Sequence, residues 1–269
     1  FGDLAVNTST SVVPNLAAWT SLNTSMQTVR ANHTATPLPN GSILLAGGSN
    51  GPSVLPTAEL FDPVLRTFAP TGSMSSARDL HTATLLPNGR VLVAGGFTTN
   101  AVSSGSTNSA EIYYPANKTW VPTAVMTSSR DQHTAVLLAD GSVLVAGGFN
   151  SSGSGYLDTA EIYYSTAGAW RSIGNAGGIL KRARASATLL PTGEVLFAGG
   201  INETGVLDTA VILNYNGINP AAATGWRAAT SMSVPTYLHS ATLLAGGSVL
   251  VAGGSNGQIG GVERQTSLM

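Results

Sequence analysis

Short apolar runs separated by polar turns fill almost the whole chain. In residues 81–96, HTATLLPNGRVLVAGG, two apolar runs flank an Asn-Gly pair, and a Gly-Gly pair ends the second run. Asn-Gly between two such runs is typical of a β-hairpin, and a type I′ turn has positive φ at both central residues. We therefore predict a hairpin with a type I′ turn in this segment.

The same segment occurs five times along the chain. Its copies are residues 33–48, 81–96, 133–148, 185–200 and 239–254, so their ends are 48, 52, 52 and 54 residues apart. A repeat near 50 residues predicts an architecture in which each unit buries its apolar surface against its neighbours.

Two further apolar runs follow each Gly-Gly pair. The third runs are 57–63, 109–115, 159–165, 209–215 and 261–267. The fourth runs open on an aromatic residue: Phe68, Trp120, Trp170 and Trp226. All are short and bounded by Gly, Pro, Asn or Ser, as strands are, and no stretch has a helical period. The pattern predicts an all-β protein of four-stranded units.

The fifth unit has no fourth run, whereas an extra run, 17–26, precedes the first unit and carries Trp19 in the same phase. We predict that residues 1–269 form one five-bladed β-propeller. Strand 17–26 would complete the C-terminal blade, because such closure removes exposed sheet edges. The predicted blades are residues 30–74, 78–126, 130–174, 182–232 and 236–269.

Acidic and basic residues repeat with the same period. Third runs carry an acid and the links between units an arginine, giving the successive pairs Glu59 and Arg78, Glu111 and Arg130, and Glu161 and Arg182. The next pair is Val211 and Thr236, which lacks both charges, and Glu263 would meet Arg30 across the closure. A buried ion without a partner is costly. The joint loss predicts structural ion pairs that run from one unit to the next.

Five units that end in Gly-Gly, two of them followed by a Tyr-Tyr pair and three by a tryptophan, resemble kelch repeats. The form R-x-x-H-[ST]-A-T-L-L-P-[ND]-G-x-V-L-V-A-G-G is also similar to units of extracellular bacterial kelch proteins and of the galactose oxidase propeller. The resemblance implies a β-propeller, but this family spans enzymes, actin-associated proteins and ligand-binding modules. The copper-radical site of galactose oxidase requires a tyrosine crosslinked to cysteine, and this chain has no cysteine.

All four histidines, at His33, His81, His133 and His239, start the innermost strand of their units. A propeller places them around the mouth of its central channel, where they could hold a metal ion or an ordered anion. A metal-dependent enzyme would use this ring, or Asp79 and Asp131 as a general acid and base. The alternative is that a copied histidine packs between blades, and we expect no cofactor.

Four Gly-Gly pairs are followed, two residues on, by asparagine. These are Asn50, Asn150, Asn202 and Asn256. They would line one face together with the polar loops 97–108 and 149–158 and with Tyr156 and Tyr237. We predict that this face binds a glycan or a protein, although asparagine also caps local turns.

The charge composition limits which classes of partner we expect. Charged residues make up 9% of the chain, against roughly 25% in typical soluble domains, and the net charge is −1. Such a surface predicts neither nucleic-acid binding nor attraction to anionic membranes, and no apolar run is long enough to insert into a bilayer. A nearly uncharged surface also favours self-association, which makes a structural subunit of an extracellular assembly the alternative function.

The chain starts without the basic and apolar regions of a signal peptide, and it is rich in Ser and Thr. We expect a mature secreted or cell-surface protein. Seven N-x-S/T sequences are possible glycosylation sites: Asn7, Asn23, Asn32, Asn40, Asn117, Asn150 and Asn202.

Overall fold

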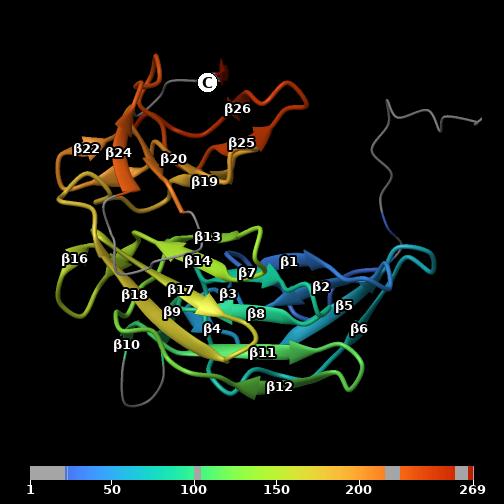
Figure 1. The fold of residues 1–269 in the computed structure, drawn as a ribbon. Helices are drawn as coiled ribbons and strands as arrows, with labels where there is room; N and C mark the ends of the chain where they lie inside the picture. The colour runs from blue at the N-terminus through green and yellow to red at the C-terminus, as the bar shows by residue number, and fades with distance from the viewer. Residues whose placement is uncertain (1–21, 23, 100–103, 216–224, 258–265, 269) are drawn as a thin grey trace, which may run out of the picture.

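The computed structural model describes residues 22, 24–99, 104–215, 225–257 and 266–268. Within these ranges all the regular elements are β-strands. The strands form four four-stranded sheets, one three-stranded sheet and four two-stranded hairpins, all antiparallel. Figure 1 shows the sheets following one another along the chain. The predicted all-β fold of four-stranded units is confirmed.

Each large sheet is built in chain order from its innermost to its outermost strand. The first contains β1 (Thr34–Pro37), β2 (Ile43–Ala46), β5 (Ala58–Asp62) and β6 (Thr67–Pro70). The second contains β7 (Thr82–Leu85), β8 (Val91–Ala94), β11 (Ala110–Tyr114) and β12 (Thr119–Pro122). The third contains β13 (Thr134–Leu137), β14 (Val143–Ala146), β17 (Thr159–Tyr164) and β18 (Ala169–Asn175).

The fourth sheet contains β19 (Ser186–Leu189), β20 (Val195–Ala198), β23 (Ala210–Leu213) and β24 (Trp226–Ala229), and the fifth contains β25 (Ser240–Leu243), β26 (Val249–Ala252) and β27 (Thr266–Leu268). The hairpins are β3 (Ser49–Asn50) with β4 (Ser53–Val54), β9 (Phe97–Thr99) with β10 (Ser104–Ser106), β15 (Phe149–Asn150) with β16 (Gly155–Tyr156), and β21 (Ile201–Asn202) with β22 (Gly205–Val206).

The apolar runs of the second, third and fourth sheets are continuous because each of these sheets is covered on both faces. In β8, Val91 packs in a buried cluster with the first sheet, while Leu92 and Ala94 pack in a cluster with the third. Successive strand residues point to opposite faces, so a sheet between two neighbours needs apolar residues at every position. The core of the protein therefore lies in the junctions between sheets.

The turn in residues 81–96 does not have the predicted type I′ geometry, because of its two central residues, Asn88 and Gly89, only Gly89 has positive φ, at 79°. The equivalent β1–β2 turn shows why. Leu38 accepts a hydrogen bond from the Gly41 amide at 2.9 Å and donates one to Ser42 at 2.8 Å, and in this turn only Gly41 has positive φ, at 87°. This is a type I turn followed by a left-handed glycine, which closes a three-residue loop. Pro39 explains the difference, because its fixed φ suits the first central position of a type I turn.

The innermost strands β1, β7, β13, β19 and β25 lie beside one another in that order, as Figure 1 shows for most of them. The fifth sheet has three strands among the described residues. Most of the predicted closing strand, with Trp19, and also Glu263 lie outside the described ranges. Closure by residues 17–26 and the count of five blades therefore stay predictions.

Candidate functional site

Each innermost strand is preceded by a four-residue entry loop of the form R-x-x-H or a variant of it. The entry loops are residues 30–33, 78–81, 130–133, 182–185 and 236–239. The second residue of each loop forms a β-bridge with the residue that follows the Gly-Gly pair of its own sheet. The entry loops and the small hairpins therefore share one face of the molecule, which we call the top face.

The first residue of the entry loop forms a buried ion pair, but with a different partner from the predicted one. Arg130 Nη2 lies 3.0 Å from Glu161 Oε1, and both side chains are at most 1% exposed. The predicted pairs ran from one unit to the next. The observed pairs lie within one unit, and they are Arg30 with Glu59, Arg78 with Glu111, and Arg130 with Glu161.

The prediction failed because it assumed that an unpaired buried arginine is not tolerated. Arg182 faces Val211 and has no carboxylate partner among the described residues. Its guanidinium instead donates to the carbonyls of Gly199, Thr209 and Ile179 at 2.9–3.0 Å. Burial lowers the pKa of Arg182 to about 10. The ion pairs therefore give no support for five blades, because their pattern does not depend on closure.

The Gly-Gly pairs are needed because neighbouring sheets meet there. The amide of the second glycine donates to the carbonyl of the next entry loop, as Gly96 does to Arg130 at 2.9 Å. A Cβ on the first glycine, Gly95, would clash with that carbonyl and with His133 Cε1. Met126 also closes on Gly95. Equivalent buried residues are Met74 and Met232. We overlooked these methionines, although the sequence places each of them four residues before an entry loop.

Three of the four histidines, His81, His133 and His239, link adjacent sheets through hydrogen bonds. His81 Nε2 lies 3.0 Å from Thr34 Oγ1, His133 Nε2 2.8 Å from Thr82 Oγ1, and His239 Nε2 2.8 Å from Ser186 Oγ. Burial lowers the pKa of His81 to about 3 and that of His133 well below its usual range. These imidazoles are therefore neutral at physiological pH.

The donors needed for a metal site do not converge. Within the ranges that the structure describes, no group of three or more His, Asp or Glu side chains could hold a metal ion. The Nε2 atoms of three histidines already face hydroxyl groups. The geometry therefore fits the packing alternative better than the metal ring.

The third residues of successive entry loops are linked by backbone hydrogen bonds. From the second loop onward, the amide donates to the carbonyl of the preceding loop, at 3.0 Å from Gln132 to Leu80 and at 2.9 Å from Arg184 to Gln132. All five residues have φ between 52° and 57°, a conformation that residues with a side chain rarely adopt. They are Asn32, Leu80, Gln132, Arg184 and Leu238. Their backbone is fixed by the repeat, whereas their side chains differ.

Asp79 and Asp131 occupy the second positions of their entry loops and are almost fully buried. Burial raises the pKa of both carboxyls. Asp131 accepts hydrogen bonds from Ser106 Oγ at 2.5 Å and from Gln132 Nε2 at 2.7 Å. Asp131 therefore fastens the β9–β10 hairpin to the next entry loop, and this role explains it without catalysis.

A hollow of about 210 Å³ opens on the top face between the third and fourth sheets. It is lined by Gln132, Phe149, Tyr156, Arg184 and Ile201. The rings of Phe149 and Tyr156 meet edge to face at 5.1 Å. The Arg184 guanidinium donates through Nε to Gln132 Oε1. It also lies 5.9 Å from the centre of the Tyr237 ring.

The hollow brings together only part of the predicted binding set. Tyr156 lines it, and Tyr237 adjoins it through Arg184. Asn150 and Asn202 cap their own turns, since their Oδ1 atoms accept from the amides of Ser152 and Thr204. Neither Asn50 nor Asn256 lines the hollow. Phe149 belongs to the loop 149–158 that was predicted to line this face. Arg184 and Gln132 were missed, although each differs from the other entry loops at the same repeat position.

The sequons are distributed over the molecule and remain possible modification sites. Asn7 and Asn23 lie outside the described residues. Asn32 has positive φ at the third position of its entry loop, and Asn40 caps the β1–β2 turn by accepting from the Ser42 amide at 3.1 Å. No helix in the described ranges is long and apolar enough to cross a membrane.

Comparisons with known proteins agree with this geometry. Residues 133–177, which span most of the third sheet, match the kelch motif. The chain has the fold of a kelch-type β-propeller. The solved structure of YjhT superposes with a TM-score of 0.69 over 88% of this chain and 84% of that chain, at 12% sequence identity. At this identity the kelch propeller shares the fold with YjhT, and nothing more follows. No curated protein matches the sequence.

Proposed function

We propose that this kelch propeller is a non-catalytic, extracellular binding module that takes a glycan or protein ligand on its top face. The observation that carries the proposal is the hollow between the third and fourth sheets. It combines an aromatic wall, Phe149 and Tyr156, with a cation, Arg184. Aromatic rings provide contact area at low entropic cost, and a guanidinium binds carboxylates well.

Arg184 is available to a ligand. Its Nε atom is used by Gln132, but its two terminal nitrogens donate to none of the described residues. Arg184 also lowers the pKa of Asp131, although burial raises that pKa more strongly. The carboxylate of the buried Asp131 thus partly offsets the positive charge of Arg184, and the two terminal nitrogens of the guanidinium remain available as donors.

The proposal can be tested with small probes and amide shifts in NMR. Galactose and galacturonate represent sugars without and with a carboxylate, and acetyl-Glu-Phe-amide represents an acidic peptide. We expect at least one probe to shift the amides of residues 149–156 and 184. Arg184→Ala should remove the response, whereas Arg171→Ala, on the outermost strand β18, should retain it. The proposal fails if no probe shifts these amides, or if Arg184→Ala responds as the unmodified protein does.

A second candidate function, self-association, is favoured by the outer face of the fifth sheet. Leu243 and Leu244 are 38% and 37% exposed. In the other sheets the first glycine of the Gly-Gly pair contacts the entry loop of the next sheet. Its counterpart in the fifth sheet, Gly253, has no such contact among the described residues. Light scattering over a dilution series tests this candidate. A mass that stays at one chain would exclude it, and Leu244→Lys should lower the mass if chains associate here.

A further inference from the structure

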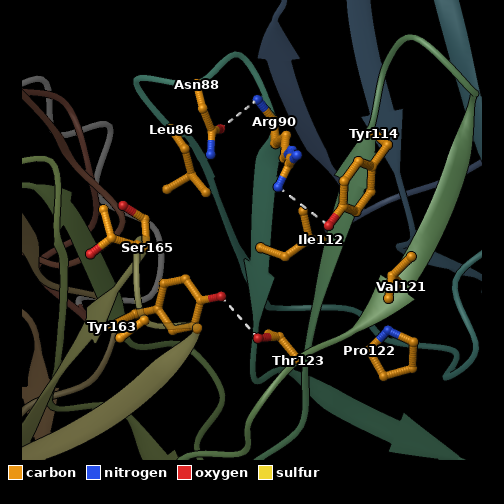
Figure 2. A pocket seen from close by; sticks show the side chains of 13 residues that line it. Leu86, Asn88, Arg90, Ile112, Tyr114, Val121, Pro122, Thr123, Tyr163 and Ser165 are labelled. Carbon is orange, nitrogen blue, oxygen red and sulfur yellow. Dashed lines mark hydrogen bonds between the residues drawn. The ribbon is translucent and has the colours of Figure 1, made fainter.

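A second hollow lies between the second and third sheets, on the face opposite the top face. Its volume is about 280 Å³, and it is lined on one side by Asn88, Arg90 and Tyr114 and on the other by Tyr163 and Ser165. Figure 2 shows these side chains facing one another across the opening. The floor is closed by the hydrogen bond between Thr123 Oγ1 and Tyr163 Oη at 2.9 Å. We call this hollow the rim slot.

The junction between the third and fourth sheets shows what such a slot accommodates. There the ring of Tyr215 packs against the buried core of the junction, and its hydroxyl donates to Asp140 Oδ2 at 3.2 Å. Its surroundings raise the pKa of Tyr215, with burial as the largest cause. At this junction the molecule fills the space with its own aromatic ring.

The rim slot is the same position one junction earlier. The strand registers align Ser165 with Tyr215, Asn88 with Asp140, and Arg90 with Ser142. Ser165 is too short to fill the slot, and its hydroxyl donates to the Gly141 carbonyl at 3.1 Å. A volume of roughly 150 Å³ already holds a benzene ring. The rim slot therefore has room for one substituted aromatic ring.

The polar groups at the rim slot are hydrogen-bond donors, whereas the group that meets Tyr215 at the next junction is an acceptor. Asn88 Oδ1 accepts from the Arg90 amide at 3.1 Å, which leaves Nδ2 as a donor where Asp140 offers Oδ2. The Arg90 guanidinium lies 4.3 Å from the centre of the Tyr114 ring, and Nη1 donates to Tyr114 Oη at 3.4 Å. No acidic residue lines the slot. The acceptor at the junction between the third and fourth sheets therefore suits the phenol of Tyr215, whereas the donors at the rim slot suit an anion.

We propose that the rim slot binds a small aromatic carboxylate. The ring takes the place that the Tyr215 ring has at the next junction, between Tyr114, Tyr163 and Ile112. The carboxylate accepts hydrogen bonds from Asn88 Nδ2 and from the Arg90 guanidinium, which stacking on Tyr114 holds in place. This site is separate from the top-face hollow, so either one can fail without the other.

Three probes separate the contributions of ring and charge. Benzoate carries both, benzamide has the ring without the charge, and acetate has the charge without the ring. In NMR titrations we expect benzoate to bind at millimolar concentrations and to shift the amides of residues 88–90 and 165–168. Benzamide should bind about tenfold more weakly, since it lacks the charge-assisted hydrogen bonds, and acetate should not saturate.

Two variants test the location, and each copies a residue that the chain already carries at the equivalent position. Ser165→Tyr should fill the slot and abolish binding of both ring probes. Arg90→Ser should weaken benzoate about tenfold and leave benzamide unchanged. Arg171→Ser, which changes an arginine outside the slot, should leave both probes unchanged.

Three results would overturn the proposal: no benzoate shifts at the slot, equal binding of acetate and benzoate, or unchanged benzoate binding in Arg90→Ser. Thermal unfolding of each variant shows whether it is folded. If Ser165→Tyr fails to fold, the comparison of benzoate with benzamide in Arg90→Ser still decides the proposal.

Discussion

The third and fourth sheets have the same frame but hold it in different ways. In both, the entry-loop arginine donates to the first glycine carbonyl of the following Gly-Gly pair, at 2.7 Å from Arg130 to Gly147 and at 2.9 Å from Arg182 to Gly199. In the third sheet Glu161 completes a buried ion pair. In the fourth sheet Val211 takes the place of that glutamate, and the arginine donates only to neutral oxygens, namely three carbonyls and the Thr209 hydroxyl.

The loop before the arginine changes together with the glutamate. Glu161 also accepts hydrogen bonds from the amides of Thr127 and Ser128, at 2.7 and 3.1 Å. Before the fourth sheet, Asp158 takes over this role by accepting from the amides of Gly178 and Leu180. An acid is therefore needed to order the loop, but it does not have to touch the arginine. A buried ion pair can be lost when its other hydrogen bonds are replaced.

The comparison also separates positions that hold the fold from positions that form sites. Copied residues, such as Gly95 and His133, contact a neighbouring sheet. The residues that depart from the repeat, such as Arg184 and Ser165, border the two hollows. In this propeller the departures from the repeat therefore mark the hollows that we propose as binding sites.

The largest expected effect comes from making the third sheet resemble the fourth. Glu161→Val leaves the Arg130 cation buried without a carboxylate and two amides without acceptors, because no counterpart of Asp158 is present. We expect a loss of about 3–5 kcal/mol in the free energy of unfolding, measured with urea. The exposed pair Glu203 and Lys181 gives the control, and Glu203→Ala should leave the free energy of unfolding almost unchanged. A loss below about 1 kcal/mol for Glu161→Val would contradict this interpretation.

The reverse change tests whether Arg182 still prefers a carboxylate. Val211→Glu and Val211→Gln disturb packing equally, but only the glutamate can pair with the cation. We expect the glutamate variant to be more stable by about 1.5–3 kcal/mol, the worth of a hydrogen bond to a charged group. Equal unfolding midpoints for the two variants would show that the carbonyl groups already satisfy the guanidinium fully.

A smaller change in stability is expected when a histidine is introduced into the fourth entry loop, which lacks one. Thr134 Oγ1 has only a 3.4 Å contact with the Ala146 carbonyl, whereas Thr82 Oγ1 lies 2.8 Å from His133 Nε2. Ala185→His should supply the missing link and stabilise the protein by about 0.5–1.5 kcal/mol at pH 8. Ala185→Phe adds a ring without the nitrogen, and an equal gain in that variant would count against the hydrogen bond.

The smallest difference concerns the tryptophans of the outermost strands. Trp170 Nε1 donates to the Ala124 carbonyl at 2.9 Å, whereas Trp226 Nε1 is buried with no partner among the described residues. Trp170→Phe should therefore cost about 1 kcal/mol more than Trp226→Phe. Urea unfolding of both variants measures the difference, and a larger loss for Trp226→Phe would contradict the assigned contacts.

The fold could be predicted from the sequence because the repeat period, the glycine pairs and the apolar runs coincide with the strands and with the junctions between sheets. The turn type was misjudged, since Pro39 acts more strongly than the Asn-Gly pair beside it. The ion pairs were assigned to the wrong partner because spacing alone does not tell which of two glutamates an arginine reaches. The rim slot was not predicted, since it arises from a residue, Ser165, that is too small for its position.

The central claim is that the copied histidines hold the sheets together and do not form a metal or catalytic site. Burial is the largest cause of the lowered pKa of His81, which is about 3. The unfolded chain takes up a proton on this histidine below pH 6.5 that the folded protein does not. Its contribution to stability is therefore complete above pH 6.5 and is lost as the pH falls toward 3.

NMR of the imidazole nitrogens between pH 8 and pH 4, with and without zinc, tests this claim most directly. We predict that the His81 and His133 signals stay in the neutral form as long as the protein remains folded, and that zinc leaves them unchanged. Titration of the two imidazoles near pH 6.5, or a shift of several histidine signals on adding zinc, would contradict the claim and restore the metal site.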